Sequence, residues 1–307
     1  MNPLRGILFK LASVSMFITM ASLIKATADH VPPGQAVFFR SFFAIPVILA
    51  WLWLRRDLST GLRVTSPMGH FWRGFVGTSA MGLGFAGLGL LPLPEVTAIG
   101  YAAPLLTVVF AAMFLGEEVR AFRLAAVFLG LVGVGVVLGP RLTVFSSDTI
   151  ETAAAFGAML VLMGAVCAAL AQIYVRKMVQ TEQTSAIVFY FSLTSTLLSL
   201  LTLPFGWVVP APTEAGLLVV AGVLGGMGQI FLTSAYRYAA ASVVAPIDYA
   251  SMVMAIGIGY FVFAEVPTLQ MLAGAGLIIF AGVLIIWREQ ALGLRREKAR
   301  QGITPQG

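Results

Sequence analysis

The sequence has 307 residues, of which 59% are hydrophobic and only 10% are charged, and its mean hydropathy is +0.94. A water-soluble domain carries about 25% charged residues, so these residues cannot cover a soluble globule of this size and predict an integral membrane protein. The net charge of +6 does not indicate nucleic acid as a partner, because the basic residues lie in short loops and in the C-terminal tail. The one cysteine, Cys167, lies in an apolar run and excludes a disulfide framework.

Apolar runs separated by polar or proline-containing breaks predict ten membrane-spanning helices, since a span needs about 20 residues. The runs are apolar on all sides, whereas the strands of a membrane β-barrel alternate apolar and polar residues. The predicted fold class is therefore an all-α polytopic membrane protein. The predicted spans cover residues 4–26, 35–54, 70–91, 94–115, 121–139, 154–175, 185–204, 215–236, 242–263 and 268–287.

Lysine and arginine gather in alternate loops, and such loops face the cytoplasm. They follow the second, fourth, sixth and eighth spans, at Arg55, Arg56, Arg63, Arg120, Arg123, Arg176, Lys177 and Arg237. Both termini are therefore expected in the cytoplasm. With five spans in each half, the second half enters the membrane from the opposite side, which predicts two inverted repeats. We expect the repeats at residues 4–140 and 154–288, followed by a basic cytoplasmic tail at 289–307 whose end looks disordered.

The two halves share a pattern in their fourth spans. Residues 95–117, EVTAIGYAAPLLTVVFAAMFLGE, align without gaps on the stretch that ends at Glu265, at a shift of 148 positions. The alignment places Val96, Ile99, Tyr101, Ala102 and Glu117 on Val244, Ile247, Tyr249, Ala250 and Glu265. Corresponding helices with polar or helix-bending residues are where transporters tend to hold substrate, so these two are predicted to carry the binding site.

The residues that a catalyst would need are missing from the sequence. His30 and His70 are expected in loops on opposite sides of the membrane, and neither has a second His or Cys at ligand spacing. No GxxxxGK[ST] phosphate-binding loop is present, which argues against ATP-driven transport within this chain. We predict no enzyme activity, no cofactor and no metal site.

Ionisable and polar residues at membrane depth are expensive, at about 2.5–3.5 kcal/mol for a charge at a helix centre, and they tend to face a cavity or a partner. Lys25, Arg73 and Glu95 lie near span ends, where snorkelling to the interface is the simpler interpretation. The remaining set gives the predicted substrate-binding residues, Arg40, Tyr101, Gln172, Gln229, Asp248 and Tyr249.

Each of these residues also has a structural interpretation. Arg40 would either form an ion pair, for which Asp248 is the candidate, or anchor a substrate. Asp248 would be a packing partner, a substrate site or a proton site. Gln172 would make a hydrogen bond between helices, and the two tyrosines would pack in the core. The sequence leaves these alternatives open.

Ten spans in two halves, FFRSFFAIP around Arg40 and FLGEE at 114–118 resemble the drug/metabolite transporter superfamily, specifically its EamA-type family. The resemblance covers residues 4–288. The second half departs from the pattern, because FAEV at 263–266 lacks the glycine of LGE. The resemblance implies a secondary carrier of the cell inner membrane, multi-pass, with a central cavity for a small metabolite.

We therefore expect a transporter of an amino-acid-like solute, or of a vitamin or aromatic solute such as riboflavin, working by alternating access. The expected partners are that solute and the lipid bilayer, with no nucleic acid. Import or export, proton or ion coupling, and a monomer or homodimer all stay open. The alternative is a non-transporting membrane protein, either an enzyme of lipid substrates or a structural subunit. A channel is disfavoured, since no ring of polar residues is repeated.

Overall fold

The protein is described by a computed structural model that covers residues 3–116, 121–142, 149–178, 181–238 and 245–302. In these ranges every regular element is a helix, as the composition predicts. Glu117 and Val244, which the alignment pairs with Glu265 and Val96, lie outside the described residues, as does Arg120 of the basic loops.

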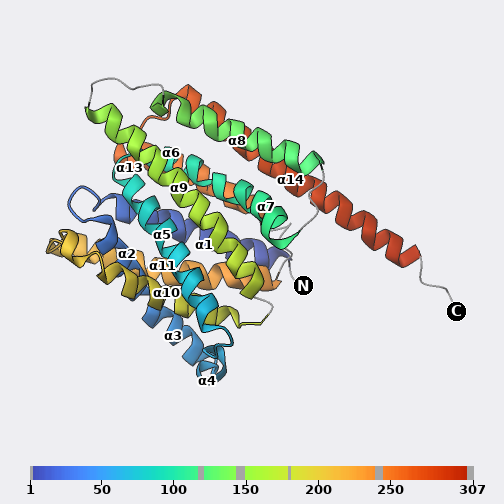
Figure 1. Ribbon diagram of the computed structural model, residues 1–307, viewed down its shortest axis with the longest axis horizontal. Helices are drawn as coiled ribbons and strands as arrows, with labels where there is room; N and C mark the ends of the chain where they lie inside the picture. Colours follow the sequence, from blue (N-terminus) through green and yellow to red (C-terminus); the bar gives the residue numbers. More distant parts are fainter. Residues whose placement is uncertain (1–2, 117–120, 143–148, 179–180, 239–244, 303–307) are drawn as a thin grey trace.

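The helices run from one end of the chain to the other with short connections (Figure 1). Their bounds are α1 Pro3–Lys25, α2 Pro33–Phe42, α3 Ala44–Leu54, α4 Leu58–Gly61, α5 Pro67–Leu88, α6 Leu93–Gly100, α7 Ala102–Leu115, α8 Ala121–Leu142, α9 Thr149–Met178, α10 Thr184–Leu200, η1 Leu203–Phe205, α11 Pro212–Tyr238, η2 Ala245–Tyr249, α13 Ala250–Phe263 and α14 Leu269–Gly302.

Within the described residues, seven helical stretches are long and apolar enough to cross a membrane, which is consistent with a polytopic membrane protein. They correspond to the predicted spans one, two, four, five, six, eight and ten. The predicted spans at 185–204 and 242–263 appear as shorter apolar helices, Thr184–Leu200 and Ile247–Phe263. The predicted span at 70–91 forms the 22-residue helix α5, which is not among the seven; it contains His70, Arg73 and many glycines, which lower its hydropathy.

Two predicted spans are each broken into two helices by a proline. Proline cannot donate to the carbonyl four residues earlier and its ring clashes with it. Pro46 lies three residues after Phe43, where α2 gives way to α3, and Pro104 lies three residues after Tyr101, where α6 gives way to α7. The break at Tyr101 falls inside one of the two aligned helices.

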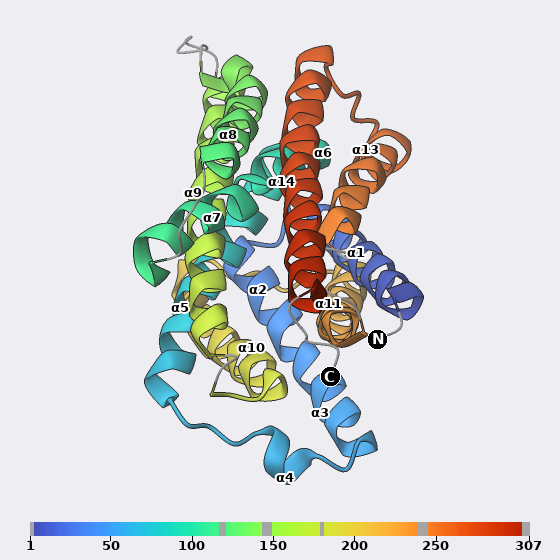
Figure 2. The ribbon, with the colours of Figure 1, turned by 90° about the vertical axis from the view of Figure 1, so that its right-hand side faces the viewer.

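Three long helix pairs form the bundle, α1 with α11, α5 with α9, and α8 with α14 (Figures 1 and 2). Small residues let the backbones approach closely, as lipid-embedded helices require. A Cβ atom added to Gly133 of α8 would lie 2.8 Å from the carbonyl oxygen of Gly274 in α14, and one added to Gly274 would lie 2.7 Å from the carbonyl oxygen of Gly133. Larger residues at either position would force these helices apart.

The C-terminal tail differs from its predicted disorder. Helix α14 continues to Gly302, and in Figure 1 it projects past the end of the bundle where the N-terminus lies. The physical reason is composition: residues 289–302 are mostly Arg, Glu, Lys, Ala, Leu and Gln, which all favour a helix. Low hydrophobicity therefore did not prevent helix formation here.

The two aligned helices end in the same way. Helix α7 ends at Gly116 with φ 65° and ψ 23°, and α13 ends at Ala264 with φ 54° and ψ 29°. Both residues are left-handed, and the alignment pairs them at the shift of 148 positions. The second half thus keeps the backbone turn although it has lost the glycine that suits it.

This turn predicts the effect of restoring glycine. A left-handed backbone conformation costs a residue with a Cβ atom about 1–2 kcal/mol. Glycine avoids this cost but loses more conformational entropy on folding, which offsets part of the gain. Ala264→Gly should therefore raise the free energy of unfolding by about 0.5–1 kcal/mol, and Gly116→Ala should lower it by a similar amount. Denaturant unfolding of the purified protein in detergent measures both; a less stable Ala264→Gly protein would contradict the assignment.

Candidate functional site: a polar cluster at two helix breaks

Tyr101 and Tyr249 lie side by side where the two aligned helices break. Tyr101 separates α6 from α7, Tyr249 is the last residue of η2 before α13, and their ring centroids are 5.3 Å apart. The Tyr101 hydroxyl donates a hydrogen bond of 2.8 Å to the carbonyl oxygen of Asp248 and also contacts the Ser251 hydroxyl. Ser251 donates to the same carbonyl at 2.7 Å. The two hydroxyls thereby satisfy a backbone group that the helix break has freed.

Asp248 adds a charge to this cluster and pairs with a lysine that the sequence analysis did not select. Lys10 of α1 places its Nζ atom 2.7 Å from Asp248 Oδ1. The Lys10 side chain is 3% exposed, whereas that of Asp248 is 45% exposed. The carboxylate therefore borders accessible space while its cation is buried. Lys10 lies inside the first span, and its depth in an apolar run was the signal that could have found it.

The ring of Tyr249 is held against α14 at a glycine. A Cβ atom added to Gly282 would lie 1.4 Å from Tyr249 Oη and 2.3 Å from its Cζ atom. No side chain fits at this position unless the ring moves. Gly276, in the same helix, has nothing within 4 Å of the position of an added Cβ.

These two glycines give a matched pair of substitutions. Gly282→Ala should displace the Tyr249 ring and lower the free energy of unfolding by about 1–3 kcal/mol, the usual cost of overpacking. Gly276→Ala should leave the free energy of unfolding unchanged or raise it by up to about 1 kcal/mol, because alanine favours a helix interior and its Cβ meets nothing. Unfolding in detergent tests both, and equal effects of the two substitutions would show that Tyr249 does not occupy this position.

Asp248 was the candidate partner for an ion pair with Arg40, but Arg40 does not pair with it. Arg40 is 4% exposed in α2, and its guanidinium carbon lies 5.5 Å from the ring centroid of Phe191 in α10. Arg73 of α5 lies over the same ring, with its guanidinium carbon 3.9 Å from the centroid. Neither Phe191 nor Arg73 was among the predicted site residues. Phe191 carries no sequence signal that separates it from other core aromatics.

The two predicted glutamines lie elsewhere. Gln172 is exposed on α9. Gln229 of α11 is half-buried and lines a small pocket with Ile48 and Trp51 of α3. The structure therefore brings together Tyr101, Asp248 and Tyr249 of the predicted site.

Lys25 pairs with a carboxylate and Glu95 with a guanidinium group, although snorkelling to the interface was the simpler interpretation of both. Lys25 Nζ lies 2.9 Å from Glu265 Oε1, donates to the carbonyl oxygens of Leu88 and Leu91, and is 13% exposed in its side chain. Glu95 accepts two hydrogen bonds from Arg141, of 2.8 and 3.1 Å. Lys25 and Glu265 thus join the first half of the chain to the second.

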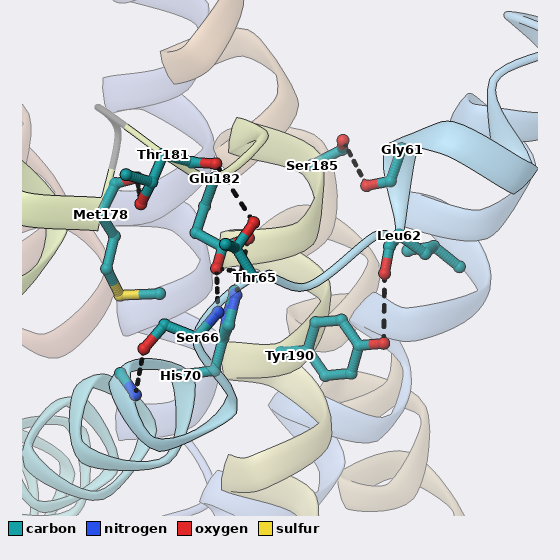
Figure 3. Close-up of polar contacts among 11 residues, drawn as sticks. Gly61, Leu62, Thr65, Ser66, His70, Met178, Thr181, Glu182, Ser185 and Tyr190 are labelled. Carbon is teal, nitrogen blue, oxygen red and sulfur yellow. Dashed lines mark hydrogen bonds and ion pairs between the residues drawn. The ribbon is translucent and has the colours of Figure 1, made fainter.

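A second contact between the halves lies in the loops, where Glu182 precedes α10 (Figure 3). One carboxylate oxygen, Oε1, accepts from the backbone N–H groups of Thr65 and Ser66 at 2.8 and 2.6 Å. The other, Oε2, lies 3.5 Å from Nε2 of His70, which is in the first turn of α5 and not in a loop as predicted. Burial works to raise the pKa of Glu182, but the two N–H groups and His70 together bring this pKa below its ordinary value of 4.5.

The lowered pKa of Glu182 predicts how stability depends on pH. A carboxylate with a depressed folded-state pKa stabilises the protein above its unfolded pKa and loses that contribution as the pH falls through the folded-state value. The melting temperature of wild type should therefore fall more steeply than that of Glu182→Gln once the pH drops below about 4.5. At neutral pH the variant should be the less stable of the two. Parallel curves over the whole range would show that the ionised Glu182 does not hold these loops together.

Residues 4–139 and 155–288 match the EamA-like transporter family. This chain belongs to the EamA-like transporter family. The match confirms the resemblance drawn from the FFRSFFAIP and FLGEE motifs, and the family consists of membrane transporters, not enzymes.

Relatives of this EamA-like transporter move different solutes. The chain is 32% identical to the pseudopaline exporter CntI of Pseudomonas aeruginosa over 283 residues, covering 91% of this chain and 95% of that protein. It is 27% identical to the S-adenosylmethionine uptake transporter of Rickettsia felis over 266 residues, covering 87% of each. A solved crystal structure with 22% identity superposes with a TM-score of 0.66 over 94% of this chain and 98% of its own, which supports the fold alone.

Among the described residues, no group of three or more His, Cys, Asp or Glu side chains is placed to hold a metal ion. The ionisable groups instead form pairs, Lys10 with Asp248, Lys25 with Glu265, and Glu95 with Arg141.

Proposed function

We propose that this EamA-like protein is a secondary transporter that carries a small organic metabolite across the cell inner membrane by alternating access. In this proposal the chain crosses the membrane ten times as two inverted five-helix repeats, residues 4–140 and 154–288, with both termini and the tail at 289–307 in the cytoplasm. Membership of a transporter family, transporter relatives and the alternation of basic loops support it.

The observation that carries the proposal is the polar cluster at two corresponding helix breaks. Tyr101 and Tyr249 are related by the shift of 148 positions and both interrupt a helix at membrane depth. Irregular backbone at that depth is tolerated where it is buried in protein or lines a cavity. Broken helices at the interface of two repeats hold the substrate in several transporter folds. We place the substrate at Tyr101, Asp248 and Tyr249, with Arg40, Gln172 and Gln229 as further candidates.

The contacts between the halves fit alternating access. In the proposed topology Lys25 and Glu265 lie at the external ends of their helices, and Glu182 lies in a cytoplasmic loop. A carrier exposes its site to one side at a time, so at least one of these contacts must open in each cycle. Both contacts involve backbone groups as well as side chains. Lys25 also donates to the carbonyl oxygens of Leu88 and Leu91, and Glu265 accepts from the N–H of Leu93. Glu182 accepts from two backbone N–H groups of one loop.

The chemistry of the cluster favours a polar, metabolite-sized solute. Two tyrosine faces can stack on a planar group, a half-exposed carboxylate can accept from an amino group, and a buried lysine can oppose a negative one. The solute is therefore amino-acid-like, or a vitamin or aromatic compound such as riboflavin. The relatives carry pseudopaline outwards and S-adenosylmethionine inwards by their names, so direction does not follow from similarity.

Metabolite profiling of medium and cells, with and without the protein, identifies the solute and the direction of transport. The purified protein in proteoliposomes should then exchange that solute without ATP. If solute flux into vesicles that contain only this protein requires ATP, the protein is not a secondary carrier.

Asp248→Asn separates the roles of its carboxylate. If Asp248 carries a coupling proton, the variant should still exchange labelled solute across proteoliposome membranes but lose accumulation driven by a pH gradient. If Asp248 binds an amino group of the solute, exchange itself should fall by about tenfold or more, because a hydrogen bond to a charged group is lost. Ser251→Ala, which removes a neighbouring hydroxyl but no charge, is the control. A folded Asp248→Asn protein with wild-type behaviour in both assays would remove Asp248 from the site.

A further inference from the structure

Arg40, a further candidate for the proposed substrate site, forms with Arg73 a second polar cluster that does not include Tyr101, Asp248 or Tyr249. Their guanidinium groups both lie over the ring of Phe191, at 5.5 and 3.9 Å from guanidinium carbon to ring centroid. The Nε and Nη1 atoms of both arginines are buried and have no hydrogen-bond partner within the described part of the chain. Two like charges thus share one aromatic ring, and no carboxylate of the described residues neutralises them.

This arrangement is costly unless something else completes it. Buried charges in proteins are normally paired or fully hydrogen-bonded, and two neighbouring cations repel each other in addition. A cation–π contact gives about 2 kcal/mol when desolvated, which is less than the several kcal/mol that each buried ion costs. Phe191 therefore does not stabilise the pair by itself. The missing interaction is with an anion.

The surrounding helices leave room for the guanidinium groups. A Cβ atom added to Gly77 of α5 would lie 2.3 Å from Arg73 Nη1, and one added to Gly225 of α11 would lie 3.1 Å from Arg40 Nε. Both glycines thus leave space that any other residue would take from an arginine. One turn further along, Thr78 and Ser195 place their hydroxyls 2.7 Å apart, again between α5 and α10.

The depth of the pair decides between two sources of an anionic oxygen group. Arg40 lies seven residues after the start of α2 and Phe191 seven residues after the start of α10, which is about 10 Å along each helix. Lipid phosphates stay at the membrane surface, outside a hydrocarbon core of about 30 Å. A carboxylate carried by a solute can reach this depth through the protein, and guanidinium binds carboxylate with two parallel hydrogen bonds.

We propose that Arg40, Arg73 and Phe191 form a binding site for a carboxylate group of the transported solute, separate from the Tyr101–Asp248–Tyr249 cluster. This inference rests on the proposed function and narrows the solute to one that bears at least one carboxylate. Arg40 and Arg73 share the charge of this group, and its arrival relieves their mutual repulsion.

The first test uses the purified full chain in detergent and a simple probe, sodium succinate, with uncharged succinamide as its control at equal ionic strength. Succinate should raise the melting temperature of wild type and succinamide should not. In Arg40→Gln and Arg73→Gln the concentration of succinate needed for half of this shift should rise at least about tenfold. Arg55→Gln should keep the wild-type response, because Arg55 is an exposed arginine that stacks on Trp51 at 4.7 Å.

The variants without ligand exclude a purely structural role. If the arginines repel each other, Arg40→Gln and Arg73→Gln should melt no lower than wild type in the absence of succinate, and Arg40→Lys should keep part of the succinate response. Variants that melt lower but keep a wild-type succinate response would overturn the proposal. A stabilising effect of phosphatidylglycerol, and none of succinate, that depends on both arginines would assign the site to a lipid headgroup and also overturn it.

The outcome for this site is separable from that for transport. If wild type and both arginine variants exchange the profiled solute with the same half-saturating concentration, the carboxylate site is wrong, but the proposed transport function stands. Should succinate bind through the two arginines while no solute crosses the membrane, the site stands and the proposed function is wrong.

Discussion

The fold depends on one constraint, which is that a helix broken inside a membrane must find partners for the backbone groups it frees. Pro104 ends α6 near Tyr101, and the short 3-10 helix η2 ends at Tyr249 in the other half. Tyr101 and Ser251 both donate to the carbonyl of Asp248. The same two breaks therefore create the need for polar side chains and bring them into contact. The substrate site proposed above uses these same polar groups.

Much of this arrangement could be predicted from the sequence because it is local or repeated. Apolar runs indicated helices, and the gap-free alignment of the two halves placed Tyr101 opposite Tyr249, whose rings are in contact. Even the left-handed turn survives at Ala264, where the sequence motif had lost its glycine. Backbone geometry is shared between the halves more closely than residue identity, since the N–H of Gly116 and that of Ala264 both donate to the carbonyl five residues earlier.

The pairing of charges could not be predicted, because partners distant in the chain have no local signal. Arg40 was the candidate partner of Asp248, which pairs with Lys10 instead. Snorkelling was the simpler interpretation of Lys25, which binds Glu265. Each of these side chains reaches several angstroms from its helix, and its partner depends on how α1 packs against the second half. The helix α5 shows a related limit, since its polar residues contact other helices and lower the hydropathy by which spans are recognised.

The two charged clusters differ in a way that bears on how a carrier would work. Lys10 and Asp248 neutralise each other without a solute, so this pair must be separated before either charge can bind a ligand strongly. Arg40 and Arg73 have no such internal partner among the described residues, so in the proposed carboxylate site an anion would bind without first breaking an ion pair. A ligand stabilises a state of the protein by as much as its interaction with that state exceeds its interaction with others. An anionic ligand would stabilise the arginine cluster more than the Lys10–Asp248 pair. The Lys10–Asp248 pair would instead separate when a ligand or a proton binds to one of its members. A solute that contacted both clusters would therefore bind first through its negative group. It would then separate the Lys10–Asp248 pair beside the helix break at Tyr249.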